Sequence, residues 1–74
     1  MLKLEHERRL RGWSRAELAR RARLDQASFT RIESGRLVPY PRQLARICRA
    51  LKLSASAGES LLQEASTGEL GKPQ

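Results

Sequence analysis

Hydrophobic residues recur at helical spacing most clearly between residues 42 and 51. Four of them stand at i, i+3, i+4 and i+7, which places their side chains on one face of a helix: Leu44, Ile47, Cys48 and Leu51. Pro39 and Pro41 interrupt regular structure before this segment, and proline fits the first turn of a helix. The pattern therefore predicts an amphipathic helix that starts with Pro41 at its first position.

Two shorter helices are predicted nearer the start of the chain. Residues 2–11 contain strong helix formers and no breaker before the first glycine, although their leucines do not form one clean stripe. A second helix is predicted after Ser14, because Ser14 and Glu17 have the spacing of a capping box. Trp13 and Leu18 occupy the positions of a hydrophobic staple across that helix start.

A third short helix is predicted between Asp25, a residue type that caps helix starts, and Gly35, a residue type that ends helices. Only two residues separate it from the second helix, so the two helices must cross sharply. Its apolar residues fall on one side, whereas the other side carries Gln26, Ala27, Thr30 and Arg31. That second side suits neither a core nor a plain soluble surface.

A fifth helix is predicted from a second capping box, Ser56 with Glu59, and is expected to run to about Ala65. Leu61 and Leu62 form its apolar pair.

The chain is expected to form one domain with a thin core, because a chain of 74 residues buries only about 60% of the surface that it exposes when unfolded. No strand pattern, repeat or long linker divides it. We predict an all-α, compact five-helix bundle over residues 1–66, followed by a flexible tail over residues 67–74 that has little to bury.

Charge narrows the class of partner. The formal net charge is +7, from 15 basic and 8 acidic residues, and twelve of the basic residues are arginine. Residues 1–52 hold fourteen basic and five acidic residues, a net +9, whereas residues 53–74 have a net −2. A small domain this basic indicates a polyanionic partner, with nucleic acid first. The alternative is an arginine-rich surface that reflects genome composition alone.

Several chemistries have no candidate residues. One cysteine and one histidine exclude an intramolecular disulfide, a cysteine-based zinc site and the usual nucleophile–histidine pairs. We expect no enzyme activity, metal, cofactor or small-molecule ligand, and we interpret Cys48 as a small buried hydrophobe. No apolar run approaches the roughly 20 residues of a membrane span, and no signal peptide is apparent. A cytoplasmic location is therefore expected.

Two short capped helices joined by a tight turn inside a basic helical domain describe a helix-turn-helix, whose second helix enters the DNA major groove. Residues 4–53 resemble the phage repressor and Cro family, also called the XRE family, with its lambda repressor-like fold. The motifs that carry the resemblance are "GWS", "ELA", "RIESGR", a proline loop and "LARICRALKLS", in that order.

The resemblance implies roles for individual residues. Arg8 and Glu33 match an internal ion pair that ties the first helix to the end of the recognition helix. Base-reading positions match Gln26, Ala27, Thr30 and Arg31, and phosphate contacts match Arg15, Ser28, Arg36 and Arg42. The sequence departs from the family pattern at Arg23, where the turn usually has glycine, and at Glu7, where an apolar residue is common.

These observations predict a sequence-specific regulator that binds double-stranded DNA and represses transcription by occupying its operator. The resemblance implies a homodimer on a pseudo-palindromic site, with Leu61 and Leu62 as the expected dimer contact. One alternative is an antitoxin-like module whose main partner is a protein, bound through Leu61, Leu62 and Leu70. Another is a non-specific nucleic-acid binder that works through charge alone.

Overall fold

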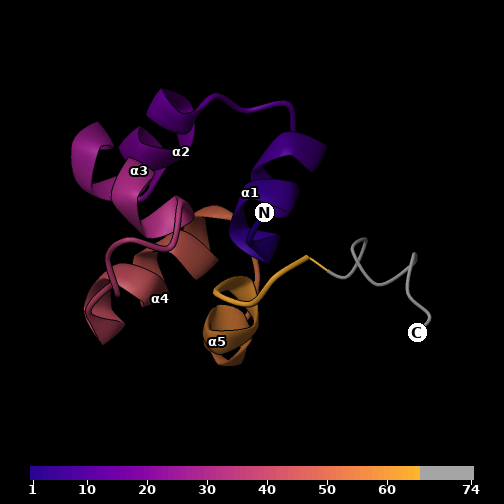
Figure 1. Ribbon diagram of the computed structural model, residues 1–74. Coiled ribbons are helices and arrows are strands. Elements are labelled where there is room, and N and C mark those ends of the chain that lie inside the picture. The colour runs from indigo at the N-terminus through magenta and orange to yellow at the C-terminus, as the bar shows by residue number, and fades with distance from the viewer. Residues whose placement is uncertain (66–74) are drawn as a thin grey trace.

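The computed structural model describes residues 1–65 and contains five α-helices (Figure 1). Their bounds are α1 Lys3–Leu10, α2 Arg15–Arg21, α3 Gln26–Glu33, α4 Pro41–Ala50 and α5 Gly58–Leu61, with a 3₁₀ turn over Ala55–Ala57. Residues 1–65 form no strand, only an isolated antiparallel bridge between Leu2 and Glu64. The predicted all-α five-helix fold is confirmed. No helix in this range has the length and apolar character that crossing a bilayer requires.

Local capping fixes where α2 and α3 begin. The Ser14 hydroxyl accepts a hydrogen bond from the backbone N–H of Glu17 at 3.0 Å, and the Asp25 carboxylate accepts one from the N–H of Ser28 at 2.9 Å. The Glu17 side chain does not return to the backbone of Ser14, because it pairs with Arg20 and Arg21 instead. Of the predicted capping box, only the hydrogen bond to the Ser14 hydroxyl is therefore formed, and the return bond from the Glu17 side chain is not.

Four helices end in the same way, with a residue in the left-handed region. Gly12 has φ +73° and Gly35 has φ +84°, whereas Arg23 and Lys52 adopt φ of 60° and 61° without being glycine. After α3, the N–H of Gly35 donates to the carbonyl of Ile32 and the N–H of Arg36 to that of Arg31, which is a Schellman motif. The turn between α2 and α3 is thus a left-handed turn built on arginine.

The core lies where α2, α3 and α4 meet and is closed by α1 and α5. Phe29, Leu18 and Ile32 are fully buried at its centre. The remaining core residues are Leu4, Ala19, Ala22, Ile47, Cys48, Leu51 and Leu61. Leu10, expected among the apolar residues of the first helix, is 66% exposed, which agrees with the poor stripe on that helix.

The prediction for the fifth helix is wrong in its start and its end. Ser56 lies in the 3₁₀ turn, and no side chain caps α5. The helix ends at Leu61 rather than near Ala65, because a turn follows it and residues 63–65 pair with the start of the chain. The N–H of Lys3 donates to the carbonyl of Gln63 at 2.8 Å, and the N–H of Ala65 donates to that of Met1 at 2.8 Å. The residues expected to form a flexible tail lie outside the described part of the chain.

Candidate nucleic-acid interface

The outward face of α3 is open to solvent. Gln26, Ala27 and Arg31 are exposed and Thr30 is half-buried, while Phe29, Ile32 and Glu33 face the interior. The Asp25 cap holds the first turn, and the hydrogen bond from the Ser28 backbone lowers the pKa of the Asp25 carboxyl. The helix therefore presents an amide, a methyl group and a guanidinium on one accessible side.

A buried carboxylate anchors this helix to the rest of the bundle. Glu33, at the end of α3, is 2% exposed, and its Oε2 accepts from Nε of Arg8 in α1 at 2.7 Å. Arg8 is 8% exposed and also donates from Nη1 to the carbonyl of Trp13 at 2.6 Å. The ion pair implied by the family resemblance is thus present, and it fixes the position of α3 against α1.

Arg15 joins this pair, which the sequence did not indicate. Its Nε donates to Oε1 of Glu33 at 2.8 Å, and the contact raises the pKa of the Arg15 guanidinium. The side chain is still 48% exposed, and a guanidinium has five N–H donors, so most of them stay free toward solvent. Glu33 thereby aims Arg15 at the solvent beside the start of α2.

An open hollow of about 530 Å³ lies next to Arg15. It is lined by residues from α1, from the start of α2 and from the start of α3: Arg8, Arg9, Ser14, Arg15, Ala16 and Gln26. Arg15 and the amide of Gln26 offer accessible donors in this hollow, whereas Arg8 is buried against Glu33 and Arg9 is paired with Glu5. The hollow lies at the N-terminal end of the exposed face of α3.

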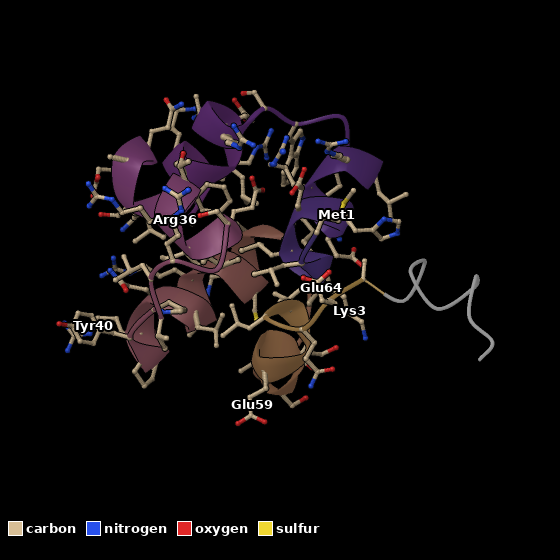
Figure 2. The ribbon with its side chains drawn as sticks, in the orientation of Figure 1. Met1, Lys3, Arg36, Tyr40, Glu59 and Glu64 are labelled. Atoms are coloured by element: carbon tan, nitrogen blue, oxygen red, sulfur yellow. The ribbon has the colours of Figure 1, made fainter. Side chains whose placement is uncertain are left out.

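The other end of that face is flanked by the loop between α3 and α4. Arg36 follows the left-handed Gly35, and Arg42 lies in the first turn of α4; both are exposed. Figure 2 shows Arg36 beside α3 and Tyr40 projecting away from the bundle at the start of α4. The backbone N–H of Tyr40 donates to Oε1 of Gln43 at 2.9 Å, a helix cap that was not predicted from the sequence. The spacing of Tyr40, Pro41 and Gln43 was its only signal.

The arginines of residues 1–65 divide into two groups by their partners. Six pair with carboxylates, and they lie in or directly after α1 or in α2: Arg8, Arg9, Arg11, Arg15, Arg20 and Arg21. Within the same described range, six others make no ion pair and no side-chain hydrogen bond: Arg23, Arg31, Arg36, Arg42, Arg46 and Arg49. The charge available to a polyanion is therefore concentrated between the α2–α3 turn and the end of α4.

The expected dimer contact is only partly accessible. Leu61 is 3% exposed because it packs into the core of its own chain, so the expectation that it contacts a second copy is wrong. Leu62 is half-buried and lines a shallow hollow of about 240 Å³ together with Leu37 and Val38. Val38 is 82% exposed. Leu70, weighed as part of a protein-binding surface, lies outside the described residues.

The part of the chain that the structure describes contains no cluster of potential metal ligands. No three histidine, cysteine, aspartate or glutamate side chains are grouped there as a metal site would require. Cys48 is buried, and burial raises the pKa of its thiol, which favours the unreactive protonated form.

Comparison with known proteins agrees with this geometry. No curated protein and no solved structure matches the chain. A family model described as a helix-turn-helix domain matches residues 2–61, which include all five helices. The chain therefore belongs to the helix-turn-helix domain family.

Proposed function

We propose that this protein is a sequence-specific regulator that binds double-stranded DNA with α3 in the major groove and represses transcription by occupying its operator. The observation that carries the proposal is the exposed side of α3, which is flanked by accessible arginines at both ends. Such a helix offers base-reading groups between two sets of phosphate-binding groups, as helix-turn-helix recognition requires.

Gln26, Ala27 and Arg31 are the proposed base-reading residues. A glutamine amide can make a bidentate contact with adenine, alanine can contact the methyl group of thymine, and arginine can donate twice to guanine. All three side chains are exposed. Thr30 is half-buried, so we assign it a contact at the edge of this face rather than at its centre.

The proposed phosphate contacts lie on either side of those residues. Arg15 reaches solvent beside the start of α2, while Arg36 and Arg42 lie at the opposite end of α3. Ser28 is half-buried in the first turn of α3, and its hydroxyl is the fourth proposed donor. These contacts would fix the register of the helix on the duplex without reading its sequence.

We further propose that two copies bind a pseudo-palindromic operator, with half-sites about 34–36 Å apart. Because Leu61 is buried, the accessible apolar surface beside Leu62, which includes Leu37 and Val38, is the proposed contact. Light scattering with and without DNA tests this step. A protein that stays monomeric, and that binds no duplex better than random DNA, would instead support the protein-partnered alternative.

The decisive experiment selects bound sequences from a random duplex pool and then compares two variants on the selected site. Gln26→Ala is expected to lose about 1–3 kcal/mol of discrimination at one base pair, because it removes a bidentate contact. Arg36→Ala is expected to weaken binding to every sequence about equally, because a phosphate contact carries no base information. Failure to select any sequence, or the same pattern of loss from both variants, would contradict the proposal.

A further inference from the structure

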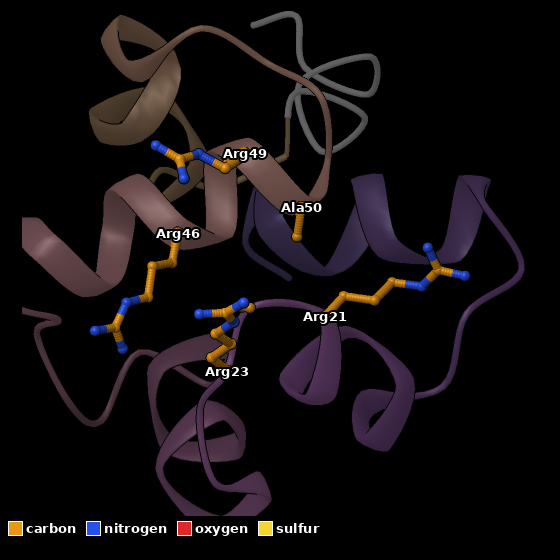
Figure 3. Close-up of a pocket in the computed structure, with 6 residues that line it drawn as sticks. Arg21, Arg23, Arg46, Arg49 and Ala50 are labelled. Carbon is orange, nitrogen blue, oxygen red and sulfur yellow. The ribbon is translucent and has the colours of Figure 1, made fainter.

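A second basic surface lies away from the reading face of α3. An open hollow of about 420 Å³ is formed where the turn after α2 meets α4, and it is lined by Arg21, Ala22, Arg23, Arg46, Arg49 and Ala50 (Figure 3). None of these residues belongs to the base-reading or phosphate-binding set proposed above. The hollow therefore needs its own explanation.

Three of its four arginines are free to bind an anion. Arg21 is already engaged, because it pairs with Glu17 and its guanidinium lies 4.1 Å from the centre of the Trp13 ring. Figure 3 shows its side chain extending away from the others. Arg23, Arg46 and Arg49 are exposed and make no ion pair within residues 1–65. Like charges gathered without a carboxylate repel one another, and a bound anion relieves that repulsion.

Arg46 and Arg49 continue a line of arginines along α4 that starts at Arg42, in the first turn of that helix. Arg42, Arg46 and Arg49 stand at i, i+4 and i+7 on the exposed side of α4, opposite the buried Ile47 and Cys48. Arg46 lines both this hollow and a second one that contains Arg42. At 1.5 Å per residue the line is about 10 Å long. One strand of duplex DNA has a phosphate about every 3.4 Å along its axis, so the line faces roughly three phosphates.

The backbone at Arg23 supplies an independent observation. Arg23 has φ 60°, in the left-handed region that glycine enters without strain and that other residues rarely adopt. The chain nevertheless has an arginine at this position, and it stands beside the two other unpaired arginines of the hollow. A strained residue retained in such a place is a reason to look for a function of its side chain.

We infer that Arg23, Arg46 and Arg49 form a second phosphate-binding surface, which takes the phosphodiester backbone of DNA outside the segment read by α3. The inference rests on the proposed function, because it takes DNA as the ligand. The surface is elongated because it continues to Arg42, and such a shape fits a linear polyanion better than it fits a compact anion. The backbone can come from the flank of the same duplex or from a second duplex, and the experiment separates these sources.

The test measures binding against salt concentration on two duplexes, one limited to the selected site and one extended on both sides. Each phosphate contact contributes about −0.9 to the slope of log K against log salt. On the extended duplex, Arg46→Gln/Arg49→Gln should reduce the magnitude of that slope by about two, while leaving the short duplex unaffected. Lys3→Gln/Arg20→Gln is the control, because it removes the same charge from α1 and α2, outside the hollow.

Contact with a second duplex is tested by capturing one labelled duplex through another. If the surface binds a second duplex, the wild type and the control variant Lys3→Gln/Arg20→Gln should join two duplexes, and Arg46→Gln/Arg49→Gln should not. The inference is overturned if that variant matches the control on both duplex lengths and in the capture assay. Failure of the proposed function is seen separately, as the absence of sequence preference in the wild type. The slope comparison can still be made then, on an extended duplex of random sequence.

Arg23 has a test that separates strain from binding. Arg23→Gly should raise the melting temperature, because glycine adopts the left-handed turn freely, and should also reduce the slope on the extended duplex. Lys52→Gly relieves the same strain at a residue that does not line the hollow and serves as the thermal control. Arg20→Gln is the single-charge control for binding. Equal slopes for Arg23→Gly and Arg20→Gln would remove Arg23 from the proposed surface.

Discussion

Replacing Glu33 with glutamine should remove a large part of the protein's free energy of unfolding. The Glu33 carboxylate is 2% exposed and accepts from Arg8 at 2.7 Å and from Arg15 at 2.8 Å. In Glu33→Gln one acceptor oxygen becomes an NH₂ donor that faces a guanidinium donor, and Arg8 stays buried without a counter-ion. Breaking a buried ion pair from one side costs about 3–5 kcal/mol.

That loss is large for a domain of this size. At about 0.05–0.15 kcal/mol per residue, a 74-residue domain has a free energy of unfolding of about 4–11 kcal/mol. One kcal/mol corresponds to about 4–8 °C in melting temperature at this length. We therefore expect the melting temperature of Glu33→Gln to fall by at least about 12 °C, measured by circular dichroism and supported by urea unfolding.

A surface ion pair on α1, the helix that carries Arg8, provides the control. Arg9 pairs with Glu5 and its side chain is 58% exposed, so Arg9→Gln should cost less than about 1 kcal/mol. The double variant Arg8→Met/Glu33→Leu removes both buried charges and should recover most of the loss, because a packed apolar pair is about as stable as a buried ion pair. If Glu33→Gln loses no more stability than Arg9→Gln, the buried ion pair does not stabilise the fold as expected.

Two further predictions concern stability. Gly58→Ala should lower the free energy of unfolding by about 1–3 kcal/mol in urea titrations, because the added Cβ would lie 2.8 Å from the Leu44 side chain. An unchanged midpoint of urea unfolding would show that the Leu44 side chain moves aside freely. Acid should destabilise the fold as the pH falls below about 4, because folding lowers the pKa of Asp25, through the Ser28 N–H, and of Glu17, through Arg21. Stability from these groups is present above their ordinary pKa and is lost on protonation. Asp25→Asn should show a shallower acid loss in circular dichroism.

The sequence predicted the elements whose signals are local. Ser14 and Asp25 cap the helices that they were expected to cap, Gly35 ends α3, and Pro41 begins α4. Each signal acts through hydrogen bonds or dihedral limits within a few residues, so no knowledge of tertiary contacts was needed. At Arg23 the sequence showed only a departure from the family's usual glycine, and the structure adds that this residue lies in the left-handed region.

The sequence did not predict what depends on contacts between distant segments. The fifth helix stops early where Gln63 pairs with Lys3, a contact between distant segments that leaves no local pattern. The contact of Arg15 with Glu33 spans α2 and α3 and required their crossing geometry. For the candidate site, the exposure of α3 agrees with the prediction, whereas its DNA contacts remain predictions.

The pairing of residues 1–3 with residues 63–65 has a practical consequence for protein engineering. Met1 and Ala65 are joined by a 2.8 Å hydrogen bond, and the amino group of Met1 lies 3.1 Å from the Glu64 carboxylate. Figure 2 shows Met1 and Glu64 close together, near α1 and α5. Because both positions lie side by side, a short connector between them should permit circular permutation with new ends in another exposed loop. The same adjacency would let the bundle be grafted as a single insert into a surface loop of a carrier protein.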